Sequence, residues 1–215
     1  MAKAENDEAR LEQLRLLNRR VHALTGGAGI VGFDQITQLT EALEALIEEL
    51  VSKPKQINAS TLRTVAAAVD SLGILFNNSR SDPHAPTAKV MVVDDEELSR
   101  RSVTHALERA KLKYIAAADP LEALQHLHSG KFNLIFLDVD MPNMNGFELC
   151  SKIRALPAYQ KTPVVFITGL NDFESRTNSM MSGGNDFIAK PFMFIELAVK
   201  ALIYVLRSQF PPVKR

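Results

Sequence analysis

Short apolar segments alternate with helical patterns over residues 89–210, and this alternation restricts the folds open to the chain. Five segments have the length and the β-branched or aromatic content of strands: residues 89–93, 114–117, 134–137, 164–167 and 187–189. The third and fourth are continuously apolar, as expected for strands buried on both faces of a parallel sheet. Helical patterns separate the strands, so we predict an α/β fold with a five-stranded, doubly wound parallel sheet.

Polar residues stand at the carboxyl ends of four of these segments. Asp94 and Asp95 follow the first, Asp138 ends the third, Thr168 ends the fourth and Lys190 follows the fifth. Each alone has an ordinary explanation as a helix cap, a strand residue or a solvated charge. In a doubly wound sheet, however, they meet at the edge where ligands bind. Three carboxylates can hold a divalent cation while a hydroxyl and an ammonium bind phosphoryl oxygens, so we predict a metal-assisted phosphate site.

The motifs around these residues occur in a recognisable order. They read VMVVDD (90–95), LIFLDVDMPNMNG (134–146), FITG (166–169) and FIAKPF (187–192). The segment 89–210 resembles the receiver domains of response regulators, the flavodoxin-like family of the chemotaxis protein CheY. The resemblance implies that Asp138 is the phosphoacceptor, and that Pro142 and Gly146 form a tight turn before the next helix.

The resemblance and the chemistry of magnesium together suggest a role for each residue. Asp95 and Asp138 are expected to ligate Mg²⁺ directly, and Asp94 through water, because this ion keeps part of its hydration shell. The backbone carbonyl of Asp140 is expected to complete the protein ligands, whereas its side chain either strengthens metal binding or faces water. Thr168 and Lys190 are expected to hold the oxygens of the aspartyl phosphate.

Phe187 occupies the position of the aromatic switch residue in the resembled family. There, movement of the hydroxyl at the position of Thr168 makes room for the ring to turn inward, which changes the adjacent surface. Phe187 lacks a hydroxyl, so it would signal by packing alone. An ordinary core phenylalanine explains the residue equally well.

The first part of the chain contains three helical stripes of apolar residues with steps of three and four. The stripes are Leu14, Leu17, Val21, Leu24 and Ala28; Ile36, Leu39, Leu43, Leu46 and Leu50; and Leu62, Val65, Val69, Leu72 and Phe76. Pro54 separates the second from the third. We therefore predict an antiparallel helical bundle over residues 1–80, a linker over residues 81–88 and the receiver-like domain over residues 89–210.

His22 lies off the first apolar stripe and is expected to face solvent. The surrounding HALTGGAGIVGF (22–33) resembles the histidine-containing phosphotransfer (HPt) domain, in which an exposed imidazole carries a phosphoryl group. Gly26 and Gly29 share the face of His22 and leave room for a partner. The chain departs from the family by having Thr25 where the motif has lysine, and three predicted helices where the family usually has four. His22 is therefore a phosphohistidine, part of a degenerate docking or dimerisation module, or an ordinary surface histidine.

The final helical segment, from Phe192 onward, is apolar on more than one face. Only one face can pack on its own sheet, so we expect the remainder to contact the bundle or a second copy of the chain. A homodimer through the bundle or this helix is one expectation. Only six residues follow Gln209, so we expect no direct transcriptional output.

Composition favours a soluble cytoplasmic protein. The chain has 25 basic and 25 acidic side chains, which argues against non-specific binding of nucleic acid. The single cysteine, Cys150, excludes an internal disulfide, and the amino terminus lacks a signal peptide. The apolar stretch over 192–206 is interrupted by Glu196 and Lys200, so we expect no membrane span.

These observations predict a two-component phosphorelay protein. Its partners would be a sensor histidine kinase or phosphotransfer protein and a downstream protein, and it would turn over its own phosphate only by slow self-dephosphorylation. One alternative is a non-relay regulator in which the bundle serves dimerisation or docking. A second is a magnesium-dependent phosphatase, which the receiver-like spacing of Thr168 and Lys190 disfavours.

Overall fold

The computed structural model describes residues 2–77, 88–169 and 182–209, and side chains from residue 8 onward. The chain forms two compact units, Met1–His84 and Ala85–Arg215. Except for Ala88, the predicted linker over residues 81–88 lies outside the described residues, so the predicted domain boundaries stay predictions.

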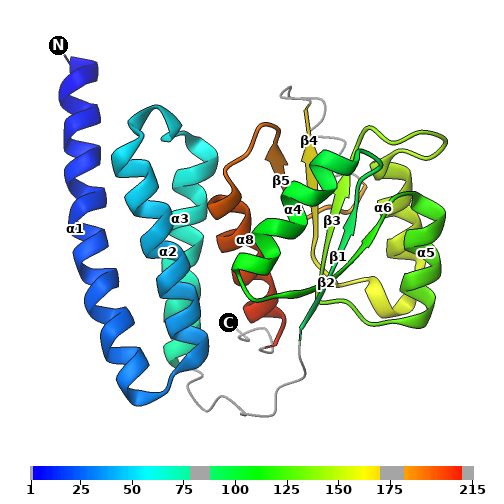
Figure 1. Ribbon diagram of the computed structural model, residues 1–215, viewed down its shortest axis with the longest axis horizontal. Coiled ribbons are helices and arrows are strands. Elements are labelled where there is room, and N and C mark those ends of the chain that lie inside the picture. The colour runs from blue at the N-terminus through cyan, green and yellow to red at the C-terminus, as the bar shows by residue number, and fades with distance from the viewer. Residues whose placement is uncertain (1, 78–87, 170–181, 210–215) are drawn as a thin grey trace. The chain divides into compact units, whose positions relative to one another are not determined.

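The first unit is a bundle of three described helices, α1 (Ala2–Val31), α2 (Asp34–Ser52) and α3 (Ala59–Asn77), whose consecutive members run in opposite directions (Figure 1). Helix α1 stops before Gly32, whose φ of 77° is unfavourable for residues with a side chain. A short 3₁₀ turn at Pro54–Gln56 joins α2 to α3. Asn58 then caps α3, because its side-chain oxygen accepts from the backbone N–H groups of Ser60 and Thr61.

The sequence periodicity located most of the bundle core. All five residues of the predicted second stripe are buried, and Leu14, Val21 and Ala28 are buried in the first. The third stripe was partly wrong: Val69 and Phe76 are exposed, whereas Ala68 and Leu75 are buried. The prediction favoured the larger side chains, but the position of a residue around the helix decides which way it faces.

The second unit contains the predicted parallel sheet. Its strands are β1 (Lys89–Val93), β2 (Lys113–Ala117), β3 (Leu134–Asp138), β4 (Val164–Thr168) and β5 (Asp186–Ala189). They lie in the order β2-β1-β3-β4-β5 and every neighbouring pair is parallel. The doubly wound α/β fold is therefore confirmed.

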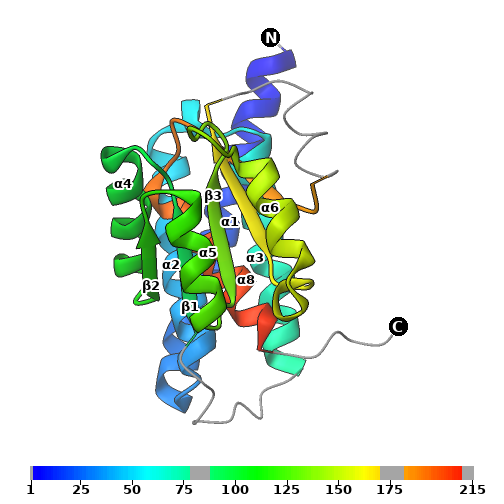
Figure 2. The same cartoon turned by 90° about the vertical axis from the view of Figure 1, so that its right-hand side faces the viewer.

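Helices cover both faces of this sheet. They are α4 (Glu97–Arg109), α5 (Pro120–Ser129), α6 (Gly146–Ala155) and α8 (Phe194–Ser208). Helices α5 and α6 lie on one face, in front of the sheet in Figure 2, and α4 and α8 lie on the other. Successive strand residues serve the two faces in turn: Phe136 joins the core beneath α4 and α8, and Leu137 joins the core beneath α5 and α6.

Both ends of α5 carry residues that favour a helix boundary. Asp119 caps the helix, because its Oδ1 accepts from the backbone N–H groups of Leu121 and Glu122. Pro120 is the first helical residue and Gly130 follows the last turn.

Helix α8 places Leu197, Ala201 and Val205 in the core that it shares with α4. The Phe194 ring also meets His105 of α4 edge-on, with ring centroids 6.1 Å apart. The expectation that other apolar residues of α8 contact the bundle or a second chain stays a prediction.

Among the described helices, α3 alone is long and apolar enough to cross a membrane. Length and composition do not separate such a helix from the core helix of a soluble bundle, and Val65 and Leu72 of α3 are buried. The expected absence of a membrane span therefore stays a prediction.

Candidate phosphoacceptor site

The sheet topology brings the predicted polar residues to one edge. Asp94 and Asp95 follow β1, Asp138 ends β3, Thr168 ends β4 and Lys190 follows β5. The backbone N–H of Lys190 donates to the carbonyl of Thr168 at 2.8 Å, which extends the pairing of the last two strands to the site. The Lys190–Pro191 peptide bond is cis.

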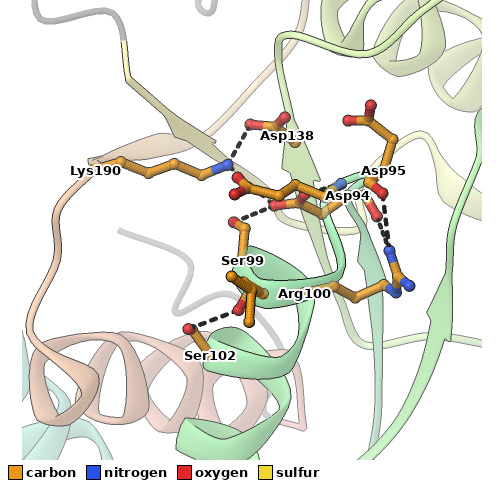
Figure 3. A network of polar contacts seen from close by, with 9 residues as sticks. Asp94, Asp95, Ser99, Arg100, Ser102, Asp138 and Lys190 are labelled. Atoms are coloured by element: carbon orange, nitrogen blue, oxygen red, sulfur yellow. Dashed lines mark hydrogen bonds and ion pairs between the residues drawn. The ribbon is translucent and has the colours of Figure 1, made fainter.

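The ammonium of Lys190 bridges two carboxylates that come from different strands. Its Nζ lies 3.1 Å from Oδ2 of Asp94 and 3.0 Å from Oδ1 of Asp138 (Figure 3). The Asp94 and Asp138 side chains are 2% and 6% exposed, against 23% for Lys190. Because buried carboxylates are costly without a compensating charge, this ammonium is a main source of stabilisation for the site.

Two residues that sequence analysis did not single out hold the acidic pair in place. Ser99 of α4 donates to Oδ2 of Asp94 at 2.5 Å, and Arg100 Nη1 donates to the backbone carbonyls of Asp94 at 2.7 Å and Asp95 at 3.3 Å. Figure 3 shows both side chains reaching the loop from the start of α4. Ser99 and Arg100 lie in the first turn of α4, directly after the acidic pair. This position in the sequence could have indicated that they contact the Asp94–Asp95 loop.

The three carboxylates form a group that fits a divalent cation. One oxygen each from Asp94, Asp95 and Asp138 lies within 4.8 Å of the others. Three hard oxygen donors match the ligands that Mg²⁺ and Ca²⁺ prefer. Asp140 is exposed and its side chain is not part of this group, while the role expected for its backbone carbonyl stays a prediction.

Burial and the Lys190 charge have opposite effects on the pKa of Asp138, the predicted phosphoacceptor. Burial raises the pKa of Asp138, and the nearby Asp94 charge adds to this rise, while the hydrogen bond and charge of Lys190 oppose it. For Lys190, burial acts to lower the pKa, but its hydrogen bond with Asp138 and the two negative charges outweigh burial and raise it. Lys190 is therefore protonated at neutral pH and can bind an anion.

A close backbone contact fixes the loop after β3. A Cβ atom on Gly146 would lie 2.1 Å from the carbonyl oxygen of Asp138, so only glycine fits there. The N–H of Gly146 donates to the Val139 carbonyl at 3.0 Å. Asn145 and Glu148 then form a capping box that begins α6. The turn that ends at Gly146 therefore helps to hold the backbone of Asp138 in position.

The predicted switch residues share one face of the sheet. Phe166 pairs with Phe187 across β4 and β5, and Thr168 lies two residues beyond Phe166. Because side chains alternate along a strand, Thr168 and Phe187 point to the same side. Thr168 is buried, and Phe187 is partly buried against the core beneath α5 and α6. This arrangement is compatible with the predicted coupling between the Thr168 hydroxyl and the Phe187 ring. The coupling itself stays a prediction.

In the bundle, His22 faces solvent as expected, with 77% of its side chain exposed. Its Nδ1 lies 2.7 Å from Oε1 of Glu44 on α2, a partner that sequence analysis missed because 22 residues separate the two. Within the part of the chain that the structure describes, a Cβ atom on Gly26 or Gly29 would have no neighbour within 4 Å, so the surface near the ring is open there.

Arg15 and Arg19, which lie on the side of α1 that carries His22, form ion pairs with Glu12. The distances are 3.6 Å for Arg15 and 3.8 Å for Arg19. All three side chains are at least half exposed, so the pairs are weak and both guanidinium groups remain accessible to an anionic partner.

The parallel fold and its acidic edge place the second unit in the class of CheY-like receiver domains. The chain belongs to the response regulator receiver domain family, whose model matches residues 90–202, and an Hpt domain matches residues 2–73. Among solved structures, chemotaxis protein CheY4 of Vibrio cholerae is 34% identical with a TM-score of 0.52, over 55% of this chain and 98% of that chain.

Curated relatives match over part of the chain. RcaC of Microchaete diplosiphon is 35% identical over 58% of this chain and 19% of that protein. RpfG of Xanthomonas campestris, a cyclic di-GMP phosphodiesterase response regulator, is 33% identical over 59% of this chain and 34% of that protein. PilG of Pseudomonas aeruginosa is 31% identical over 53% of this chain and 85% of that protein. The chain therefore spans well under half the length of the first two relatives.

Proposed function

We propose that the chain is a two-component phosphorelay protein in which Asp138 accepts a phosphoryl group and His22 exchanges one with a receiver aspartate. The observation that carries the first part is the Lys190 ammonium, within 3.1 Å of carboxylates at the ends of two strands. Such a bridge places a cation next to the oxygen that would be phosphorylated.

The Asp138 carboxylate supplies the nucleophile. One of its oxygens attacks phosphorus, and the bond between phosphorus and the donor breaks with its electron pair going to the donor. Lys190 then contacts a phosphoryl oxygen in place of the free carboxylate, and Thr168 donates its hydroxyl to another. Mg²⁺ held by Asp94, Asp95 and Asp138, with the Asp140 carbonyl, would neutralise the negative charge that gathers there.

The output of the receiver is a change in its partner-binding surface. When the Thr168 hydroxyl moves toward the phosphoryl group, the space it leaves admits the Phe187 ring, because both side chains lie on the same side of β4 and β5. The surface near β5 changes as the ring turns, and a downstream protein reads that change.

Partners follow from the two domains. A sensor histidine kinase or a phosphotransfer protein supplies phosphate to Asp138, and a receiver aspartate of this or another chain exchanges phosphate with His22. We place the protein in the cytoplasm as a phosphoacceptor rather than a turnover enzyme, apart from slow self-dephosphorylation. A homodimer through the bundle or α8 is a further expectation, which sedimentation velocity would test.

The test is phosphorylation with a radiolabelled small-molecule phosphodonor and Mg²⁺, in the wild-type chain, Asp138→Asn and His22→Gln. We expect an alkali-labile acyl phosphate that Asp138→Asn removes and His22→Gln retains. Transfer from a phosphorylated receiver should label His22 in an acid-labile, alkali-stable form. An acyl phosphate of undiminished yield in Asp138→Asn would refute the assignment of the phosphoacceptor.

The non-relay alternative remains testable in the same experiment. If a phosphorylated receiver transfers nothing to His22 while the Asp138 acyl phosphate forms, the bundle serves docking or dimerisation. Rapid multiple turnover of small phosphate esters would instead support the phosphatase alternative. The exposed His22 imidazole on an open helix face favours the relay over both.

A further inference from the structure

The Asp94 carboxylate accepts hydrogen bonds at both of its oxygens. The backbone N–H of Glu96 donates to Oδ1 at 2.9 Å. Oδ2 accepts from Ser99 Oγ at 2.5 Å and from Lys190 Nζ at 3.1 Å (Figure 3). A carboxylate offers about four lone-pair positions, two on each oxygen. Within the described part of the chain, these contacts therefore leave Asp94 one position for a further ligand, on Oδ1.

The two donors to Oδ2 differ in how firmly they are held. Ser99 lies in the first turn of α4, so its short side chain is fixed by the helix. Lys190 reaches the same oxygen with a long, flexible side chain that is 23% exposed and also contacts Asp138. The Asp94 side chain is 2% exposed, so water competes little with either donor. Ser99 is therefore the more rigid partner of Oδ2.

The contact with Ser99 limits how Asp94 can meet a cation. Binding through both oxygens of a carboxylate requires a lone pair on each oxygen that faces the ion. Both lone pairs of Oδ2 are occupied while Ser99 and Lys190 donate to it. Asp94 can then offer one oxygen to an ion, either directly or through water.

This restriction distinguishes between hard divalent cations. Mg²⁺ requires near-octahedral geometry, keeps several waters and takes few carboxylate oxygens from a protein. Ca²⁺ takes about six to eight oxygens in a flexible geometry and readily binds a carboxylate through both oxygens. An Asp94 whose Oδ2 is occupied suits Mg²⁺, whereas an Asp94 with both oxygens available would add a ligand that favours Ca²⁺.

We propose that Ser99 is a positioning residue that makes the acidic site prefer Mg²⁺ to Ca²⁺, because it keeps Oδ2 of Asp94 from binding the ion. This inference rests on the proposed binding of Mg²⁺ by Asp94, Asp95 and Asp138. The preference serves the proposed reaction, because the longer bonds of Ca²⁺ would hold the Asp138 carboxylate and the phosphoryl oxygens less closely.

Titration calorimetry of the full chain with Mg²⁺ and with Ca²⁺ gives the selectivity as the ratio of the two dissociation constants. Ser99→Ala removes one donor from Oδ2, and we expect the preference for Mg²⁺ to fall by about tenfold, the lower end of the range for residues that support metal ligands. Ser99→Thr keeps the hydroxyl and should keep the wild-type ratio. An unchanged ratio in Ser99→Ala would overturn the proposal.

The control is Ser102→Ala, which removes a hydroxyl from the next turn of α4. Ser102 donates to the Leu98 carbonyl at 2.8 Å and should leave the ratio as in the wild type. If Ser99 only stabilised the loop, Ser99→Ala would weaken the binding of both ions by the same factor, and the ratio would not change. Circular dichroism checks that the variants fold. Ser99→Cys, whose thiol is a weak donor, provides the same test with little change in shape.

Crystal structures with Ca²⁺ provide a second measurement. In the wild type we expect one oxygen of Asp94, or neither, within about 2.6 Å of the ion, and in Ser99→Ala we expect both. Binding through both oxygens in the wild type would contradict the role of Ser99.

The two proposals fail in different ways. Binding of Mg²⁺ by the wild type without formation of an acyl phosphate contradicts the phosphoacceptor function alone. Formation of the acyl phosphate with an unchanged ratio in Ser99→Ala contradicts the role of Ser99 alone. Absence of any metal binding in the wild type, by contrast, contradicts both the Mg²⁺ site and the selectivity.

Discussion

The Lys190 ammonium lies 3.0 Å from Oδ1 of Asp138 and contacts Oδ2 of Asp94 at the same time. One cation thus compensates two carboxylates that are 2% and 6% exposed. A divalent ion in the acidic group would compensate the same carboxylates, so Lys190 and the ion partly replace each other. We therefore expect the stability of the receiver to depend on Lys190 and, when an ion is bound, on the ion as well.

Replacing Lys190 tests that dependence. Lys190→Met leaves the two buried carboxylates without their cation and should destabilise the metal-free receiver by about 3 kcal/mol. Added Mg²⁺ should restore more stability to the variant than to the wild type, because the ion would compensate carboxylates that have lost the Lys190 ammonium. Differential scanning calorimetry with and without Mg²⁺ measures both effects.

The control for Lys190 is Lys152→Met, which removes an exposed lysine from α6. This variant should unfold within about 0.5 kcal/mol of the wild type and respond to Mg²⁺ as the wild type does. Equal Mg²⁺ stabilisation of Lys190→Met and Lys152→Met would show that Lys190 does not share the role of the ion.

The backbone contact between Gly146 and Asp138 predicts a strong effect of one methyl group. In Gly146→Ala the Cβ atom would lie 2.1 Å from the Asp138 carbonyl oxygen, so the loop after β3 must shift. We expect a loss of about 2–3 kcal/mol, as for an overpacked site, together with slower acyl phosphate formation. Urea denaturation followed by circular dichroism and labelling with a phosphodonor provide the measurements.

Gly169 offers a matched comparison near the same edge of the sheet. Among the described residues, a Cβ atom there has no neighbour within 4 Å, so Gly169→Ala should change stability by no more than about 0.5 kcal/mol. If both alanine variants behaved alike, the close approach of Gly146 would not limit the position of Asp138.

Arg100 should control metal affinity without touching the metal. Its guanidinium holds the carbonyls of Asp94 and Asp95, so Arg100→Met lets the acidic loop move. We expect about a tenfold loss of Mg²⁺ affinity by isothermal titration calorimetry, the lower end of the range for residues that support metal ligands. Arg101→Met, which removes only an exposed ion pair with Glu97, should bind Mg²⁺ like the wild type. A tenfold loss of Mg²⁺ affinity in both variants would show that the net charge of the domain, and not the contact of Arg100 with the loop, sets the affinity.

If Thr168 is coupled to Phe187, a change at Thr168 should block the response of the Phe187 ring without blocking phosphorylation of Asp138. Thr168→Val keeps the shape of the side chain but removes the hydroxyl that would move toward the phosphoryl group. Asp138 should still be phosphorylated, while the NMR signals of the Phe187 ring should no longer shift on adding beryllium fluoride as a phosphoryl mimic. Thr168→Ser should retain the shift. A normal ring response in Thr168→Val would contradict the coupling.

Local patterns were sufficient for the elements and for much of the core. Continuous apolar runs identified β3 and β4, because the burial of such strands depends mainly on their own residues. Periodicity failed at Val69 and Phe76 of α3, which are exposed. At these two positions the large apolar side chains suggested burial, but their positions around the helix direct them away from the bundle core.

For the candidate site, the sequence alone determined the chemical inventory and the edge of the sheet at which it would collect. Asp94, Asp138 and Lys190 were predictable because a parallel sheet gathers the ends of its strands. Only the tertiary structure decided how they are paired: a lysine between two carboxylates, an arginine on the loop carbonyls, and Glu44 on the His22 ring. Such contacts join residues distant in the chain, and their geometry depends on packing that no local pattern records.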